Sequence, residues 1–107
     1  MPRRLNTDFE RLVIEHRAYL EPHITVTEVA RRLQSNKTYV SRLVNESYGT
    51  SFPNLINALR IRYAREYLAE HPDARQSEVA AACGFTSVSF FSRIFKQHTG
   101  TTPGSLR

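Results

Sequence analysis

The chain has 107 residues, enough for one domain or two very small subdomains, and it carries a formal net charge of +5. Its single cysteine excludes an intramolecular disulfide, and no apolar run approaches the roughly 20 residues that cross a bilayer. The first residues lack the apolar segment of a secretion signal, so we expect a cytoplasmic protein. The positive charge favours a polyanionic partner, although a basic balance alone suits RNA, or a solvated surface without a partner, equally well.

Helical periodicity covers almost the whole chain and no strand pattern is convincing, which predicts an all-α fold of about seven helices. The N-terminal segment, residues 1–23, contains an amphipathic helix over residues 8–20 that Pro22 ends. We expect this helix to cover the first core. Its inward-facing residues are expected to be Phe9, Leu12, Val13, His16 and Leu20.

Residues 24–50 predict two short helices joined by a tight turn. Thr25 stands three residues before Glu28, the spacing of a capping box, and therefore begins the first helix. After the turn, a second helix over residues 36–48 ends at Gly49, which suits the C-cap. The inner face of this second helix is marked by Val40, Leu43 and Val44.

Residues 51–71 predict one long helix. Apolar residues keep helical phase from Phe52 to Leu68, and Pro72 ends the helix. About 20 residues at roughly 1.5 Å each give a rod of about 30 Å, close to the roughly 34 Å between successive major grooves on one face of B-DNA. We therefore expect this linker helix both to pack in the core and to space two flanking units.

Residues 72–107 repeat the first arrangement with a less clear beginning. Arg75 stands where the first unit has Thr25, and an arginine side chain cannot accept the capping bond. Asp73 and Gln76 offer an alternative capping box, which predicts an earlier start for this helix.

The next helix is expected over residues 87–99, with Ser87 as its N-cap and Gly100 at its end. Thr102 is expected to begin a final turn. The core face of the 87–99 helix is expected to comprise Phe90, Phe91, Ile94 and Phe95.

The two units are an internal repeat. The segment TEVA of residues 27–30 recurs fifty residues later as SEVA, and Ser41-Arg42 and Gly49-Thr50 recur fifty-one residues later. Each copy has the pattern of a helix-turn-helix, whose second helix has a shape that can enter the major groove of duplex DNA.

A set of residues in the linker and the second unit falls in the order and spacing of a known family. They are Phe52, Ile56, Asn57, Arg60, Ile61, Ala64 and Leu68 in the linker, and Val79, Ala80, Gly84, Phe85, Ser89, Phe91, Ser92, Arg93, Phe95, Lys96, Gly100 and Pro103 in the second unit. Through these residues the chain, from about residue 24 to 107, resembles the DNA-binding domain of AraC-type (AraC/XylS family) transcription regulators. The resemblance implies two helix-turn-helix subdomains joined by a long helix. The sequence departs from the family pattern at Val44-Asn45, Gln76 and Leu106.

Helix geometry and the resemblance select overlapping surfaces for base readout. With the apolar residues inward, the opposite face of each second helix is polar and carries an arginine, Arg42 in the first unit and Arg93 in the second. Either arginine suits a bidentate contact to guanine, with a phosphate contact or a solvated position as the alternative. Together with the family's matching positions, this gives as base-readout residues Asn36, Lys37, Thr38, Ser41, Arg42, Val88, Ser89, Ser92 and Arg93.

Groups that flank the reading helices are candidates for phosphate contacts, which position a protein on DNA without reading sequence. Several lie at helix N-termini, where free N–H groups and the macrodipole favour an anion. These candidates are Thr25, Thr86, Ser87, Lys96, Thr101 and Thr102. Arg60, on the linker, matches a family position for which the resemblance implies a structural role.

No residue pattern indicates a catalytic centre, a metal site or a cofactor. The four histidines are dispersed without a zinc-type spacing, and Cys83 falls on the inner stripe of a helix, where a small buried hydrophobe is expected. There is no Gly-rich phosphate loop and no nucleophile elbow.

These patterns predict a transcription regulator that binds double-stranded DNA at a promoter or operator, reading a directional site with helices 36–48 and 87–99. RNA polymerase is a further expected partner, and a sensing or dimerisation domain is expected upstream in a longer chain. The alternative is a protein-interaction module that docks RNA polymerase or another regulator and has only non-specific DNA affinity. An enzyme would need a cluster of titratable groups that the sequence lacks, and the narrow major groove of A-form RNA would exclude these helices.

Overall fold

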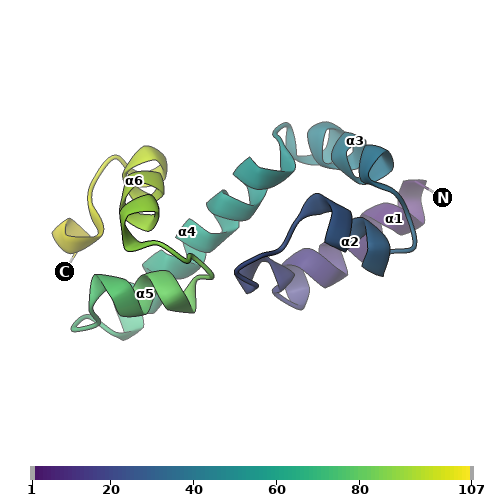
Figure 1. The fold of residues 1–107 in the computed structure, drawn as a ribbon. Coiled ribbons are helices and arrows are strands. Elements are labelled where there is room, and N and C mark those ends of the chain that lie inside the picture. Colours follow the sequence, from purple (N-terminus) through teal and green to yellow (C-terminus); the bar gives the residue numbers. More distant parts are fainter. Residues whose placement is uncertain (1, 107) are drawn as a thin grey trace. The chain divides into compact units, whose positions relative to one another are not determined.

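The computed structural model describes the backbone of residues 2–106 and the side chains of residues 4–104. Within this range the chain is helical and contains no strand, which confirms the predicted all-α class. The chain divides into two compact units, one ending at Ile56 and the other beginning at Asn57. The six α-helices (Figure 1) are α1 (Pro2–Phe9), α2 (Val26–Arg32), α3 (Lys37–Tyr48), α4 (Phe52–Glu70), α5 (Gln76–Ala82) and α6 (Val88–Thr99).

The N-terminal segment departs from the single helix predicted over residues 8–20. Helix α1 begins at Pro2, widens into a π-helical turn over Glu10–Glu15, and gives way to a 3-10 turn over Ala18–Leu20. In the wide turn the His16 N–H donates to the Arg11 carbonyl at 2.8 Å, five residues back. This extra residue in the turn shifts the helical phase. His16 is therefore exposed, contrary to the prediction.

The residues after the wide turn complete the first core instead. Phe9 and Val13 are fully buried, as predicted, while Ala18 and Tyr19 replace His16 on the inside. Arg17 adopts a left-handed conformation (φ 59°), which redirects the chain between the wide turn and the 3-10 turn. The segment therefore does cover the first core, through a bent path.

Side-chain caps define the helix-turn-helix of the first unit. The Thr25 hydroxyl oxygen accepts from the Glu28 N–H at 3.1 Å, and the Asn36 side-chain oxygen accepts from the Tyr39 N–H at 3.0 Å. Each bond satisfies an N–H group that would otherwise have no partner in the first helical turn. Gly49, in the left-handed conformation, ends α3. The Thr25 cap and the end of α3 at Gly49 agree with the sequence-based prediction, whereas the capping role of Asn36 was not predicted.

Helix α4 begins and ends within a residue of the predicted linker helix. Ser51 caps it, since its hydroxyl oxygen accepts from the Asn54 N–H at 3.3 Å. Its buried side chains include Phe52, Leu55 and Ile56 in the first unit. Further along, Ile61, Ala64 and Leu68 join the core of the second unit.

Helix α5 begins at Gln76, so the earlier start predicted from Asp73 is wrong. The preceding residues form a turn in which the Ala74 N–H donates to the His71 carbonyl at 3.0 Å. Ala74 is buried in the core of the second unit, which holds this turn in place and prevents the helix from extending backward. Arg75 is the N-cap residue and makes no side-chain capping bond, as predicted.

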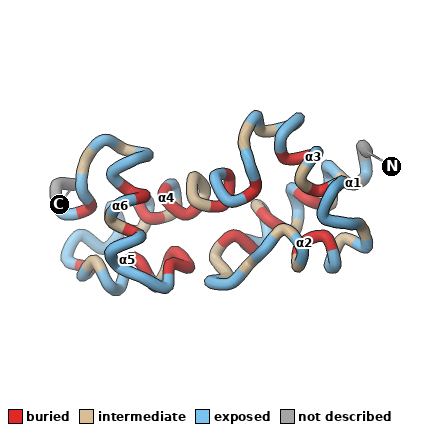
Figure 2. The backbone as a smooth tube through the Cα atoms, turned by 45° about the horizontal axis from the view of Figure 1, so that its top comes forward, coloured by how far each residue is buried: buried red, intermediate tan, exposed pale blue. Residues whose placement is uncertain are grey.

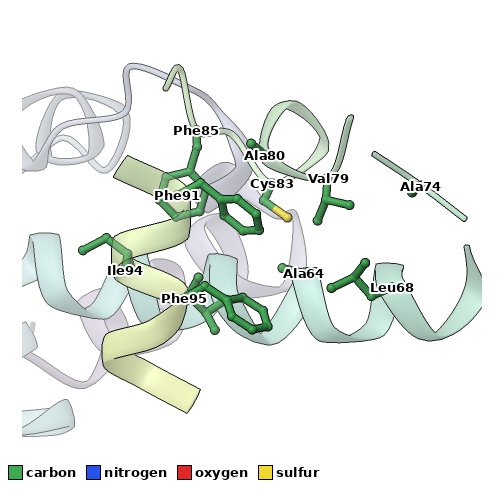
Figure 3. Close-up of a cluster of buried hydrophobic side chains, with 11 residues drawn as sticks. Ala64, Leu68, Ala74, Val79, Ala80, Cys83, Phe85, Phe91, Ile94 and Phe95 are labelled. Carbon is green, nitrogen blue, oxygen red and sulfur yellow. The ribbon is translucent and has the colours of Figure 1, made fainter. Parts of the chain in front are cut away.

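The core of the second unit lies between α4, α5 and α6 (Figure 3). Phe91 and Phe95 on α6 are fully buried, and Cys83, which follows α5, points into the same cluster. Phe90, which was predicted to belong to this face, is 37% exposed and lies at its edge. Figure 2 shows the resulting alternation of buried and exposed segments along each helix. The side chain of Leu106 lies outside the described residues, although a 3-10 turn spans Pro103–Leu106.

Candidate nucleic-acid interface

Helix α3 presents a polar face opposite its core residues. Val40, Leu43 and Val44 are buried, which turns the other side of the helix to solvent. Of the five base-readout candidates in this unit, Asn36, Lys37, Thr38 and Arg42 are exposed and Ser41 is half-buried. The structure therefore brings these five together on the N-terminal half of one helix.

Helix α6 presents the corresponding face in the second unit. Val88, Ser89 and Arg93 are exposed. Ser92 is half-buried, and its hydroxyl donates to the Gln76 side-chain oxygen of α5 at 3.0 Å. The first unit has Val26 in place of Gln76, and a valine cannot accept such a bond. Ser92 is thus hydrogen-bonded to the preceding helix α5, whereas Val26 on α2 offers Ser41 no equivalent acceptor.

Of the phosphate candidates, Thr25 caps α2, and the others lie before, within or after α6. Thr25, Thr86, Ser87, Lys96 and Thr102 are exposed, and Thr101 is half-buried. The Ser87 hydroxyl oxygen accepts the capping bond of α6 from the Phe90 N–H at 3.2 Å. A hydroxyl that accepts a capping bond still carries a proton, so Thr25 and Ser87 can each cap a helix and donate to a phosphate.

Each candidate base-reading arginine lies over an exposed aromatic ring three residues earlier. The Arg42 guanidinium carbon is 6.0 Å from the centroid of Tyr39, and that of Arg93 is 5.1 Å from the centroid of Phe90. Tyr39 is 55% exposed. Sequence reasoning missed both aromatic residues. The available signal was their identical position, fifty-one residues apart, relative to the repeated Ser-Arg pair.

The arginines on α2, the first helix of the first helix-turn-helix, are paired with carboxylates. Arg32 pairs with Glu21 at 2.6 Å, and both Arg31 and Arg32 pair with Glu28 at 2.7 Å. Hydrogen bonds from Arg31 and Arg32 lower the pKa of Glu28 to about 2. Arg42 and Arg93 form no ion pair with another described residue. Arg42 on α3 and Arg93 on α6 therefore differ from Arg31 and Arg32 on α2, whose charges are matched by carboxylates.

A groove of about 1260 Å³ in the first unit adjoins the exposed polar face of α3. One wall is formed by α1, which is tied to α3 by a bond from the Ser47 hydroxyl to the Asn6 side-chain oxygen at 3.0 Å. The lining includes two arginines, Arg4 and Arg42, and two carboxylates, Asp8 and Glu46. Because these charges balance, the groove extends the polar surface of α3 without forming an anion site of its own.

Two titratable residues of the second unit, Cys83 and Arg60, are buried. Cys83 is fully buried, and burial raises the pKa of its thiol to about 12. Arg60 is buried and lies 5.3 Å from the ring centroid of Phe85. Among the side chains of residues 4–104, no cluster of histidine, cysteine or carboxylate groups could hold a metal ion, and none of the helices described is long and apolar enough to span a membrane.

Comparison with known proteins agrees with this architecture. A family described as a helix-turn-helix domain matches residues 29–107. The HTH-type transcriptional regulator GlxA of Rhizobium meliloti is 36% identical over 88 residues, which cover 82% of this chain and 27% of that protein. The uncharacterized HTH-type transcriptional regulator YtdP of Bacillus subtilis is 33% identical over 95 residues, covering 89% of this chain and 12% of that protein. The chain therefore spans less than a third of either regulator.

Solved structures show the same fold. The C-terminal domain of AraT, a response regulator from Geobacillus stearothermophilus, superposes with a TM-score of 0.80 at 25% identity, covering 99% of this chain and 82% of that one. A DNA-binding transcriptional dual regulator from Escherichia coli K-12 gives a TM-score of 0.77 at 23% identity, covering 94% and 86%. The chain belongs to the AraC-type helix-turn-helix family, whose members are DNA-binding domains of transcription regulators and not enzymes.

Proposed function

We propose that this domain binds double-stranded DNA sequence-specifically, with α3 and α6 each entering a segment of the major groove. One observation carries the proposal. Two equivalent helices, each with buried apolar residues on one face, present an arginine without a carboxylate partner at equivalent positions, Arg42 and Arg93. A guanidinium fork on an exposed helix face matches the two acceptors that guanine presents in the major groove.

The two reading faces differ, so the proposed site is directional. Lys37 and Thr38 stand near the start of α3, whereas Val88 and Ser89 stand near the start of α6. A lysine donates hydrogen bonds, while a valine offers only apolar contact, for example to a thymine methyl group. One monomer would therefore recognise two different half-sites and would not require a palindrome.

The test is selection of bound sequences from a random duplex pool at fixed salt, with wild type, Arg42→Ala and Arg93→Ala in parallel. We expect wild type to select two half-sites about 10 base pairs apart, and each variant to relax one half only, by about 1–3 kcal/mol of discrimination. Arg31→Ala is the charge-matched control. Arg31 is exposed and pairs with Glu28 on α2, so its loss should leave the selected sequence unchanged.

If no sequence is enriched and binding weakens uniformly with salt, the domain contacts only phosphates. A protein-interaction module that docks RNA polymerase or another regulator then becomes the better description. The chain spans less than a third of the GlxA and YtdP regulators, so we further propose that it works within a longer protein with a sensing or dimerisation domain.

A further inference from the structure

The same contact occurs in both units beside the proposed base-reading residue. Arg42 lies over Tyr39 and Arg93 lies over Phe90, with guanidinium-to-centroid distances of 6.0 Å and 5.1 Å. We propose that Tyr39 and Phe90 are positioning residues that hold these guanidinium groups ready to read DNA bases. This inference rests on the proposed function.

Exposure indicates that the two rings do more than fill the cores. Tyr39 is 55% exposed and Phe90 is 37% exposed, whereas the neighbouring core positions Val40 and Phe91 are fully buried. Residues three apart on a helix are surface neighbours. Each ring therefore stands on the reading face beside its arginine.

The contact suits base readout because an aromatic face attracts the cation without requiring a hydrogen bond from its N–H donors. The electrons of an aromatic face attract the cation within about 6 Å. The five N–H donors lie in the guanidinium plane, and an arginine held over a ring without a carboxylate partner keeps them available for the in-plane fork that guanine requires. A carboxylate partner would occupy that fork, as Glu21 occupies the fork of Arg32.

Preorganisation gives this contact a thermodynamic effect on binding. A free arginine side chain samples many rotamers and loses that freedom when it docks. If the ring has already restricted those rotamers, less entropy is lost on binding DNA. The aromatic ring should therefore increase discrimination between base pairs at the position that the arginine contacts.

The Phe90 ring packs against other aromatic rings of the second unit. The Phe90 ring lies 5.9 Å from the Phe85 ring, which lies 5.3 Å from the buried Phe91 ring. The second unit also has the shorter cation-to-ring distance. We therefore expect a larger effect at Phe90 than at Tyr39.

The test is a double-mutant cycle read as sequence discrimination. Affinities are measured for the selected duplex and for one with the Arg93-dependent base pair replaced, using wild type, Phe90→Leu, Arg93→Ala and the double variant. Leucine keeps an apolar side chain but removes the aromatic face. We expect Phe90→Leu to lower discrimination at that base pair about 2–5-fold, and Phe90→Tyr to restore it. In the Arg93→Ala background, Phe90→Leu should cause no further loss of discrimination.

A second readout follows the arginine in the free protein. The Arg93 Nε–H resonance should carry a ring-current shift that Phe90→Leu removes and Phe90→Tyr retains. A structural role for Phe90 would not require this shift. A parallel double-mutant cycle in the first unit uses Tyr39→Leu and Arg42→Ala. The Tyr39 ring is more exposed than the Phe90 ring, so its loss disturbs the core less.

The outcomes separate this inference from the proposed function. If Arg93→Ala leaves the selected sequence unchanged, the proposed function fails. If Arg93→Ala relaxes one base pair but Phe90→Leu lowers affinity equally for both duplexes, with or without Arg93, base reading stands and the positioning role is overturned.

Discussion

Asn36 serves as the N-cap of α3 and is also a candidate reader of bases. Its side-chain oxygen accepts the Tyr39 N–H, and the residue is exposed at the start of the helix. Its amide NH2 group supplies two further hydrogen-bond donors. Aspartate caps a helix as well as asparagine does, but it lacks the amide donors and adds a negative charge. The Asn36→Asp substitution therefore separates the two roles.

We expect Asn36→Asp to leave stability within about 0.5 kcal/mol of wild type while lowering DNA affinity. Asn36→Ala removes the cap and should cost about 1 kcal/mol of stability. Urea unfolding and duplex titration at fixed salt measure the two effects. Unchanged DNA affinity in Asn36→Asp would restrict Asn36 to its capping role.

Cys83 makes stability depend on alkaline pH. Burial raises the pKa of its thiol to about 12 in the folded state, against an ordinary value of 9.0. Between these values the folded chain holds a proton that the unfolded chain has released. Its contribution to stability is therefore complete below pH 9 and declines as the pH rises toward 12, by up to about 1.4 kcal/mol per pH unit.

Urea unfolding of wild type and Cys83→Ala, from pH 8 to pH 11 with a reductant present, checks this expectation. Tyrosines and lysines titrate in both proteins, so the difference between the two slopes isolates the thiol. Wild type should lose stability more steeply than Cys83→Ala above pH 9. Parallel curves would show that Cys83 is solvated in the folded protein.

The two helix-turn-helix turns have the same hydrogen bonds but different residues. The Ser35 N–H donates to the Ala30 carbonyl at 2.9 Å, and the Phe85 N–H donates to the Ala80 carbonyl at the same distance. The residue before each donor is left-handed, Gln34 with φ 56° and Gly84 with φ 89°. Only glycine adopts this conformation without steric cost.

We expect Gln34→Gly to stabilise the first unit by about 0.5–1 kcal/mol, since relief of the left-handed strain exceeds the entropy that glycine adds to the unfolded chain. Gly84→Ala should destabilise the second unit, where the same conformation meets a Cβ atom. The urea unfolding midpoints of the two variants measure these changes in stability. A loss of stability in Gln34→Gly would mean that the Gln34 side chain forms a compensating contact.

The accuracy of the sequence-based predictions varied between elements for physical reasons. Helices α3, α4 and α6 were predicted within a residue because local features define their ends, such as the Ser87 cap and the glycines Gly49 and Gly100. The wide turn over Glu10–Glu15 carries no such local signal. The start of α5 was missed because burial of Ala74, a tertiary effect, overrides the capping pattern.

The candidate interface shows the same division between local and tertiary information. Helical phase was enough to predict which face of α3 and α6 is polar. It was not enough to place Phe90, because a large ring at the edge of an apolar stripe turns inward or outward according to its neighbours. The repeat places Tyr39 and Phe90 at equivalent positions beside Arg42 and Arg93, but the position of each guanidinium over its ring depends on side-chain rotamers that the sequence does not specify. DNA contact by these residues stays a prediction.

At the scale of the whole molecule, each unit has a core of its own. Phe9 in the first unit and Phe91 in the second are fully buried. Truncating a buried phenylalanine to alanine costs about 3–5 kcal/mol, comparable with the whole stability of such a small unit. A single substitution should therefore unfold one unit.

We expect Phe91→Ala to remove amide protection from α5 and α6 while α2 and α3 stay protected, and Phe9→Ala to do the reverse. Hydrogen exchange followed by mass spectrometry resolves these segments. Loss of protection along the whole chain in either variant would show that α4 couples the cores into one cooperative structure.

The division into two separately packed units has a consequence for how such a regulator evolves. If each of α3 and α6 reads one half-site, as we propose, a substitution on the exposed face of α3 leaves the packing of α6 untouched. One half of the recognised sequence can then change while the other half keeps the protein bound to its DNA. A lineage could therefore acquire a new target gene through intermediates that still bind. With a single reading helix, each such change would put the entire interaction at risk.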